Sequence, residues 1–212
     1  MSDIGLFEAM YSARALRRLK PDPVPEEIIT KILDAAIRAP SAGNSQHWVF
    51  VVVRDPELRR ELGTIYRKAS DIAKVIYQAR ARPEHMTEEQ YQRMMSSGAY
   101  LWEHVGEAPV LLVPCLRDRA VPPRESLPPA VQLNYEEEVA YSDRIRGASI
   151  YPAVQNIILA CRAFGLASCP GGEFARRRAR ARIRSTLIAS WDRNSTGCVF
   201  RLAAISLKKQ WR

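Results

Sequence analysis

The chain has 212 residues, of which 47% are hydrophobic, so it can bury one sizeable core and is not an intrinsically disordered protein. Its formal net charge of +9 belongs entirely to residues 173–212, which hold 11 basic and 2 acidic residues, whereas residues 1–172 hold 21 of each. The charge is therefore no sign that the body of the protein binds nucleic acid. The four cysteines form no CxxC pair and the three histidines are scattered, so we expect no metal site, and reduced thiols as in a cytoplasmic protein.

The first third of the chain predicts three helices and a strand. Leu6, Met10 and Ala13 recur at helical spacing and predict a helix over residues 6–19, which the proline-rich turn "KPDPVP" ends. "WVFVVV", residues 48–53, predicts a strand buried on both faces, and a third helix is expected after Asp55. Between them, a second helix is expected from Pro25, with a buried face made of Ile28, Ile29, Ile32, Leu33, Ala36 and Ile37.

The rest of the chain predicts helices around one further strand. Residues 70–107 are polar and helical in character with a break at Pro83, residues 108–116 predict a second buried strand, and residues 119–130 a proline-rich loop. A long buried helix is expected over residues 147–168, ending near Gly165. Its Gln155, Asn156 and Arg162 argue against a membrane span.

The chain changes character beyond residue 170. An arginine-dense run is followed by a short apolar stretch at residues 199–205, and neither permits a firm assignment. We therefore divide the chain into a body, residues 1–172, and a basic C-terminal segment, residues 173–212.

Two short stretches carry the chemistry of a binding site, and each also has a simpler explanation. "RALRR", residues 14–18, offers guanidinium groups that match phosphate, although such charges more often form a solvated helix face. The loop "PSAGNSQ", residues 40–46, has amide and hydroxyl groups that can bond a planar heterocycle. Turn chemistry alone also explains its serines, glycine and asparagine, so the composition leaves both alternatives open.

The stretch "YSARALRRLKPDPVPEEIITKILDAAIRAPSAGNSQHWVFVVV", followed downstream by "ASIYPAVQNIILACRAFGLAS", resembles the nitroreductase family of FMN-dependent oxidoreductases. The resemblance covers residues 5–169. It implies an α+β fold with a mixed sheet wrapped by helices, in an intertwined homodimer that has two FMN sites at the subunit interface.

The resemblance also implies which residues meet the flavin. Arg14, Ala15 and Arg17 would meet its phosphate and ribityl chain, with Arg18 a further candidate. The partner subunit would supply a loop that contains Pro40, Ser41, Ala42 and Asn44, and Gln46 would support this loop. Gly171 and Gly172 would offer backbone N–H groups to the same cofactor.

By this resemblance the protein is an FMN-dependent NAD(P)H oxidoreductase with a ping-pong flavin mechanism. Its acceptor would be a small electrophile such as a nitroaromatic, a quinone or an enone, and reductive dehalogenation is a related activity. No catalytic side chain is expected, because the flavin carries the chemistry.

The sequence departs from the family pattern at four places, one of which is His47, where proline is common before the tryptophan. Ala13 stands at the first basic position of the arginine motif, Ala15 stands at its small hydroxyl position, and the resemblance is lost after Ser168, as it would be after a shifted reading frame or a replaced terminus. One alternative is therefore a catalytically impaired relative with an incomplete cofactor site. Another is a binder of nucleic acid or of an acidic surface through residues 176–184, which we do not favour because no aromatic side chain interleaves its six arginines.

Overall fold

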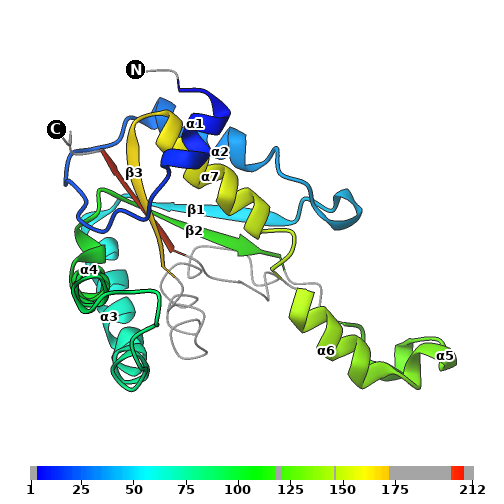
Figure 1. Ribbon diagram of the computed structural model, residues 1–212. Coiled ribbons are helices and arrows are strands. Elements are labelled where there is room, and N and C mark those ends of the chain that lie inside the picture. Colours follow the sequence, from blue (N-terminus) through cyan, green and yellow to red (C-terminus); the bar gives the residue numbers. More distant parts are fainter. Residues whose placement is uncertain (1–3, 118–120, 146, 172–201, 208–212) are drawn as a thin grey trace.

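The computed structural model describes residues 4–117, 121–145, 147–171 and 202–207, and it shows an α+β fold in which helices cover both faces of a four-stranded sheet (Figure 1). The helices are α1 (Leu6–Ser12), α2 (Glu26–Ala36), α3 (Pro56–Gln78), α4 (Glu88–His104), α5 (Pro129–Gln132), α6 (Tyr135–Ile145) and α7 (Tyr151–Ala163). The strands are β1 (Trp48–Val53), β2 (Val110–Leu116), β3 (Leu166–Gly171) and β4 (Leu202–Leu207). Short 3₁₀ turns are η1 (Ala42–Asn44), η2 (Val105–Glu107) and η3 (Arg124–Ser126).

The sheet has the strand order β1-β2-β4-β3, and its neighbouring strands are antiparallel. β4 lies between β2 and β3, so that Leu111 of β2 and Cys169 of β3 both face Ala204. Within the described residues, parallel pairing is limited to one bridge between Ala15 and Ser168. The expected mixed sheet is therefore an antiparallel sheet with a single parallel contact at its β3 edge.

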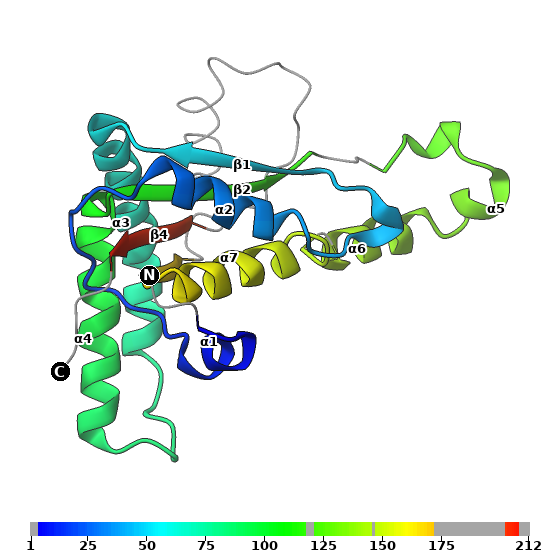
Figure 2. The same ribbon diagram turned by 90° about the horizontal axis from the view of Figure 1, so that it is seen from above.

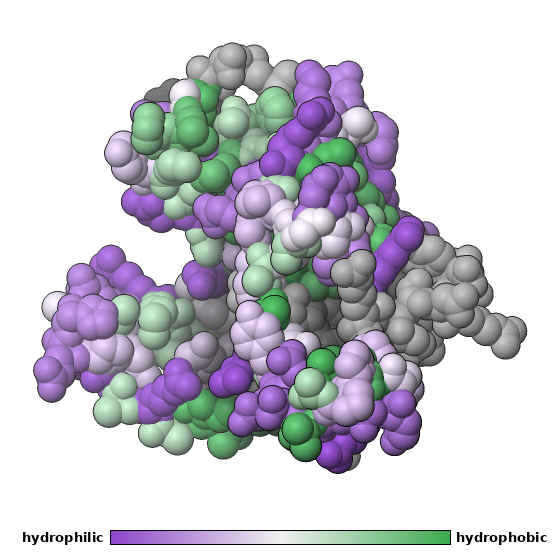
Figure 3. Space-filling view, turned by 90° about the vertical axis from the view of Figure 1, so that its right-hand side faces the viewer, coloured by the Kyte–Doolittle hydropathy of each residue, from purple (hydrophilic) through white to green (hydrophobic). Residues whose placement is uncertain are grey.

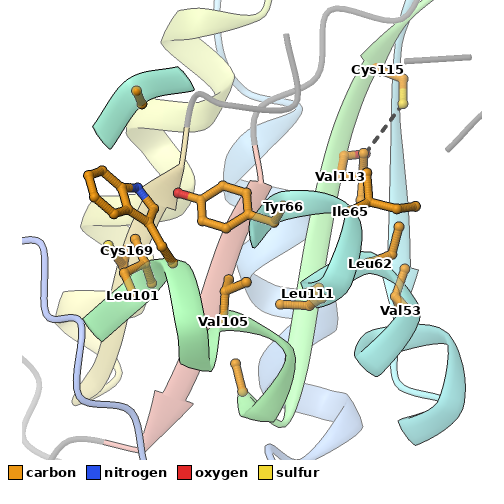
Figure 4. Packing of buried hydrophobic residues seen from close by; sticks show 13 residues of the cluster. Val53, Leu62, Ile65, Tyr66, Leu101, Val105, Leu111, Val113, Cys115 and Cys169 are labelled. Carbon is orange, nitrogen blue, oxygen red and sulfur yellow. Dashed lines mark hydrogen bonds between the residues drawn. The ribbon is translucent and has the colours of Figure 1, made fainter. Parts of the chain in front are cut away.

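Alternate residues of β2 face two hydrophobic clusters on opposite sides of the sheet. Leu111 and Val113 pack with α3 and α4 on one face, whereas Leu112 packs with α2 and α7 on the other. Figure 4 shows the first cluster, in which Tyr66 of α3 and Leu101 of α4 point toward the strands. All of β2 is buried, which confirms the buried strand expected at residues 108–116. β1 is half-buried except at its last residue, so the burial expected on both of its faces is wrong.

The helix expected from Pro25 is α2. Pro25 is its N-cap residue, and Glu26 and Glu27 lie in its first turn, where negative side chains are favourable. Most of its predicted apolar face is buried. Ile37 is the correction: it lies at the C-cap, past the buried face, and is 48% exposed.

Two predicted helices are shorter than expected. α1 ends at Ser12 instead of at residue 19, because Ala13 is extended and the chain then pairs with β3. α7 ends at Ala163, because Gly165 adopts a left-handed φ of 73° that turns the chain into β3. The stop expected near Gly165 is therefore confirmed, and residues 166–168 belong to a strand.

Two helical pairs extend from the sheet. α3 and α4 pack side by side (Figure 1), and their connection contains the break expected at Pro83. The arm, residues 121–145 with α5 and α6, projects away from the sheet (Figure 1), and α6 has no buried residue. The face from which the arm projects carries separate hydrophobic patches among hydrophilic side chains (Figure 3). Of the helices described, none is both long enough and apolar enough to cross a bilayer.

Candidate functional site

The arginine segment, residues 13–18, runs along the outer edge of β3. The backbone N–H of Leu16 donates to the carbonyl of Ser168 at 3.1 Å, and Ala15 forms a parallel bridge with the same residue. An extended stretch projects successive side chains to opposite sides. Side chains of this extended segment therefore contact both α1 and α4.

Two of the arginines contact α4. A terminal nitrogen of Arg17 lies 3.5 Å from the hydroxyl oxygen of Ser97, a long hydrogen bond. The guanidinium carbon of Arg18 lies 4.2 Å from the ring centroid of Tyr100, which is a cation–π contact. Arg17 is half-buried, whereas Arg18 is exposed.

A cavity of about 200 Å³, here called the cationic cavity, lies between α1, the arginine segment, α7 and β3. It is lined by Ser12, Ala13, Arg14, Leu16, Ile158, Arg162, Leu166 and Ser168. The Nε of Arg162 donates to the hydroxyl of Ser12 at 2.8 Å, and its guanidinium lies 4.0 Å from the Glu8 carboxylate. Arg14 donates to two carbonyls at the end of α1, at 2.7 and 2.8 Å.

The chemistry of the cationic cavity suits an anion. Two guanidinium groups line it, and one of them, Arg162, is held in place by α1. Ser168, a buried polar residue that is 5% exposed, also belongs to its wall. Fixed guanidinium donors beside hydroxyl groups bind a phosphate ester or a carboxylate better than an uncharged group.

A second cavity, of about 270 Å³ and here called the aromatic cavity, lies between α3, α4 and the end of β3. It is lined by Arg17, Tyr66, Tyr77, Met94, Met95, Gly98, Leu101, Trp102, Pro170 and Gly171. A Cβ atom on Gly171 would lie 2.7 Å from the Tyr66 hydroxyl oxygen, so only glycine fits where β3 reaches α3. Aromatic rings, thioethers and one guanidinium suit a flat conjugated ligand with a polar edge.

The loop of residues 40–46 is exposed and held mainly by its own hydrogen bonds. The N–H of Gln46 donates to the hydroxyl of Ser41 at 3.0 Å, and the Gln46 amide donates to the Asn44 side-chain oxygen at 2.7 Å. Gly43, Asn44 and Gln46 have positive φ angles of 58°, 49° and 46°, and glycine and asparagine tolerate this region best. The N–H of Ala42 donates to Ser149 at 3.2 Å, just before α7.

One protomer does not bring this loop to the arginine segment. Residues 14–18 precede α2 and residues 40–46 follow it, so its 11 residues separate them by about 16 Å of helix. Figure 2 shows them at opposite ends of α2 and α7. Within one protomer the two elements are therefore separated by the length of α2.

The site residues predicted from the sequence thus fall into two groups. Around β3 the structure gathers Arg14, Ala15, Arg17, Arg18 and Gly171. The distant group contains Pro40, Ser41, Ala42, Asn44 and Gln46, of which Ser41 alone is half-buried and the others are exposed. Gly172 lies outside the described residues.

Sequence reasoning missed several residues that line the cavities. Arg162 served only as an argument against a membrane span, although a lone cation on an apolar helix predicts a polar partner. Ser12 and Ser168 gave no signal, because their role depends on how the end of α1 meets the edge of β3. Tyr66 lies on the helix expected after Asp55, to which the sequence assigned no role, and Trp102 lies within residues 70–107, which the sequence marked only as polar and helical.

The described thiols are structural. Cys161 on α7 is buried, and burial raises the pKa of its thiol to about 12, so at neutral pH it is neither a nucleophile nor a metal ligand. Cys115 and Cys169 are also buried, and the Cys115 thiol donates to the Val113 carbonyl at 3.5 Å. In the part of the chain that the structure describes, no group of histidine, cysteine or acidic side chains could hold a metal ion.

Comparisons with known proteins add a family and a fold. A sequence model of the Nitroreductase family matches residues 11–197. The chain is 54% identical over 54 residues to an NADH dehydrogenase of Thermus thermophilus, covering 26% of each chain. It is 29% identical over 107 residues to iodotyrosine deiodinase 1 of Rattus norvegicus, covering 50% of this chain and 35% of that one. The match therefore spans about a quarter to a third of these curated relatives.

A solved structure resembles the chain over most of its length. It is a nitroreductase with bound FMN from Bacteroides fragilis, with a TM-score of 0.63 and 17% identity, covering 97% of this chain and 89% of that one. At this level of identity the likeness concerns the fold.

Proposed function

The chain belongs to the nitroreductase family, and from this premise we propose that it is an FMN-dependent NAD(P)H oxidoreductase that reduces a small electrophilic acceptor. The observation that carries this proposal is the pair of cavities flanking the arginine segment. One is cationic and lined by hydroxyl groups, and the other is aromatic and closed by β3. A flavin mononucleotide has a phosphate at one end and a conjugated ring at the other, so the two cavities match its two ends.

The residues around β3 fit this cofactor. Arg14 and Arg162 would hold the phosphate in the cationic cavity, together with the hydroxyls of Ser12 and Ser168. Arg17 would contact the polar edge of the ring, and Gly171 lets the Tyr66 hydroxyl approach the end of β3 beside it. When bound, FMN supplies hydride and electron transfer between a nicotinamide and the acceptor.

We further propose that the active protein is a homodimer in which each site combines the arginine segment of one copy with the loop 40–46 of the other. The separation of the two elements by α2 supports this arrangement. The arm supports it too. Its helix α6 has no buried residue, and Leu133 and Tyr141 of the arm are 83% and 51% exposed. Isolated monomers rarely leave such groups of apolar side chains in water.

The acceptor is a small, flat electrophile such as a nitroaromatic, a quinone or an enone. The Tyr77 and Trp102 rings, whose centroids are 6.1 Å apart, and two methionines on α4 favour such a molecule. NAD(P)H and the acceptor would bind at the aromatic cavity one after the other, as a ping-pong scheme requires. The similarity to an NADH dehydrogenase supports a nicotinamide donor.

The test is subunit complementation. One chain carries Arg14→Ala and Arg17→Ala, the other carries Asn44→Leu, and heterodimers are isolated through two different affinity tags. If each site takes one element from each subunit, a heterodimer contains one site with both defects and one intact site. We expect each parental homodimer to lose FMN or its reduction by NAD(P)H, and the heterodimer to regain about one FMN per dimer and about half the wild-type rate.

The control is a heterodimer of two wild-type chains with the same tags, which sets the full FMN content and rate. No recovery in the mixed dimer would contradict the shared site and place both elements in one protomer. A wild-type dimer that binds no FMN would contradict the proposed cofactor itself.

A further inference from the structure

We propose that Tyr100 is a positioning residue for the flavin site, and that it acts by holding the arginine segment against α4 through Arg18. This inference rests on the proposed function, since it assigns Arg18 to alignment of the segment and not to contact with the phosphate. The sequence motif alone would count Arg18 among the phosphate ligands.

The geometry is a stack of three side chains closed by a carboxylate. The guanidinium of Arg18 lies 4.2 Å from the Tyr100 centroid. On the same helix, the His104 ring stacks with Tyr100 at 4.1 Å between centroids and 23° between planes. The Nδ1 of His104 lies 2.8 Å from the Glu107 carboxylate. Tyr100 is therefore held by its helical neighbour four residues on and presents its ring to Arg18.

α4 is a firm support for such a contact. Leu101 and Trp102 are 5% and 7% exposed and belong to the hydrophobic cluster with α3 and the sheet. Glu103 forms ion pairs with Lys74 and Arg67 of α3, at 3.2 and 3.4 Å. The part of α4 that carries Tyr100 is thus fixed to α3 on one side, and its other side contacts the arginine segment.

The arginine segment needs this support because its backbone contacts are few. Its described backbone contacts are the bridge to β3, the hydrogen bond from Leu16 to Ser168, and one at its start from the Ala13 N–H to the Ala9 carbonyl at 2.9 Å. The other side-chain contact with α4, from Arg17 to Ser97, is long at 3.5 Å. The Arg18–Tyr100 contact is therefore the better-formed of the two described side-chain links between the segment and α4.

A first experiment needs no flavin. We would measure hydrogen exchange of the Leu16 amide in cofactor-free protein carrying Tyr100→Leu or Tyr100→Phe. Leucine removes the ring, so exchange should be faster by roughly two- to fivefold, the size that an exposed cation–π contact supports. Phenylalanine keeps the ring and should restore the wild-type rate, while amides of β1 should not change in either variant. Unchanged Leu16 exchange in Tyr100→Leu would overturn the proposal.

A second experiment separates alignment from phosphate contact. Affinities for FMN and for riboflavin, which lacks the phosphate, would be compared in Arg18→Leu, Tyr100→Leu and the double variant, with Arg93→Leu on the exposed face of α4 as control. We expect both flavins to weaken by the same two- to fivefold factor, and the double variant to lose no more than either single one. A loss confined to FMN would instead make Arg18 a phosphate ligand and overturn the proposal. If the wild type binds neither flavin, the proposed function fails, and the exchange experiment still decides the role of Tyr100.

Discussion

The arginine segment and the loop of residues 40–46 flank the same helix, α2, but different contacts hold them. The arginine segment is bound to its own chain on three sides, by β3, by the end of α1 and by α4. The loop is exposed, bonds mostly to itself and reaches the rest of the protomer through Ala42 and Ser149. One half of the proposed site is thus held within the protomer, while the other half is exposed, as a site shared between two copies would require.

The largest expected effect comes from the half that is already formed. Arg14→Ala combined with Arg17→Ala removes two guanidinium groups, and each charge-assisted hydrogen bond is worth about 1.5–3 kcal/mol. FMN should therefore bind at least tenfold more weakly, measured by fluorescence titration. Riboflavin should lose less affinity, because it has no phosphate.

Arg38→Ala with Arg93→Ala is the matched control, since both side chains are exposed and each forms its described ion pair with an acidic residue four positions earlier. Full FMN affinity in the Arg14 and Arg17 double variant would show that the arginine segment is not the cofactor-binding half.

The next effect tests whether the loop half depends on a second copy. Leu133→Asp places a charge on the arm at a residue that is 83% exposed. Because burying a leucine is worth about 1.5–3 kcal/mol, the dimer should dissociate at least tenfold more readily, measured by sedimentation over a dilution series. Val75→Asp, on α3 at 65% exposure, adds the same charge and should leave the dimer intact. An unchanged dimer in Leu133→Asp would exclude the arm from the interface.

A smaller effect is expected within the loop itself. Asn44→Gly keeps the left-handed φ of 49° but removes the amide, so reduction of the flavin by NAD(P)H should slow roughly two- to tenfold without a change in melting temperature. Asn44→Leu should lower the melting temperature as well, because leucine is strained at this φ. Stopped-flow reduction and thermal melts give the two readouts. If both variants reduce flavin at the wild-type rate, the loop is an ordinary connector.

The smallest effect concerns the support behind the arginine segment. The hydrogen bond from Lys74 holds the pKa of Glu103 below its usual value, and Arg67 acts in the same direction. A carboxylate with a lowered folded-state pKa stabilises the fold at neutral pH, and this contribution is lost as the pH falls through that pKa. Glu103 is 43% exposed, so Glu103→Gln should lower the melting temperature by no more than about 2 °C at pH 7.

The difference between wild type and Glu103→Gln should disappear in acid, where the wild-type carboxylate is protonated too. Glu57→Gln, in an exposed pair at 3.6 Å with Arg60, is the control. A difference that persists at acidic pH would mean that the Glu103 charge is not its cause.

Local sequence patterns predicted the elements that an apolar stripe, a continuous apolar run or a capping residue decides. The stripe of α2, the strands β1 and β2 and the start of α3 after Asp55 are where the sequence places them, because a local pattern decides them. Residues 13–18 have helical spacing as well, yet they are extended, because pairing with Ser168 competes with the helix. Ser168 lies 153 residues after Ala15 and leaves no trace in the local pattern.

The candidate site divides along the same line. The arginines of residues 14–18 and the loop of residues 40–46 could be selected as candidates from the sequence, because the residues of each stretch are consecutive. Arg162, Ser12 and Ser168 meet only after α1 and α7 have packed against β3, so no spacing rule could join them. The prediction that residues 173–212 depart from the family remains a prediction, because only residues 202–207 of that stretch are described.

The strand order also has a consequence for how the protein is made. β4 follows β3 in the sequence but lies between β2 and β3. Until residue 207 has left the ribosome, β2 and β3 each keep an unpaired edge, and such edges attract other strands. β3 and the arginine segment that pairs with it cannot join the β1–β2 pair before β4 is present to lie between them. We therefore expect a chain that completes its sheet only after nearly all of the described sequence has been synthesised, and that most needs chaperone protection in that interval.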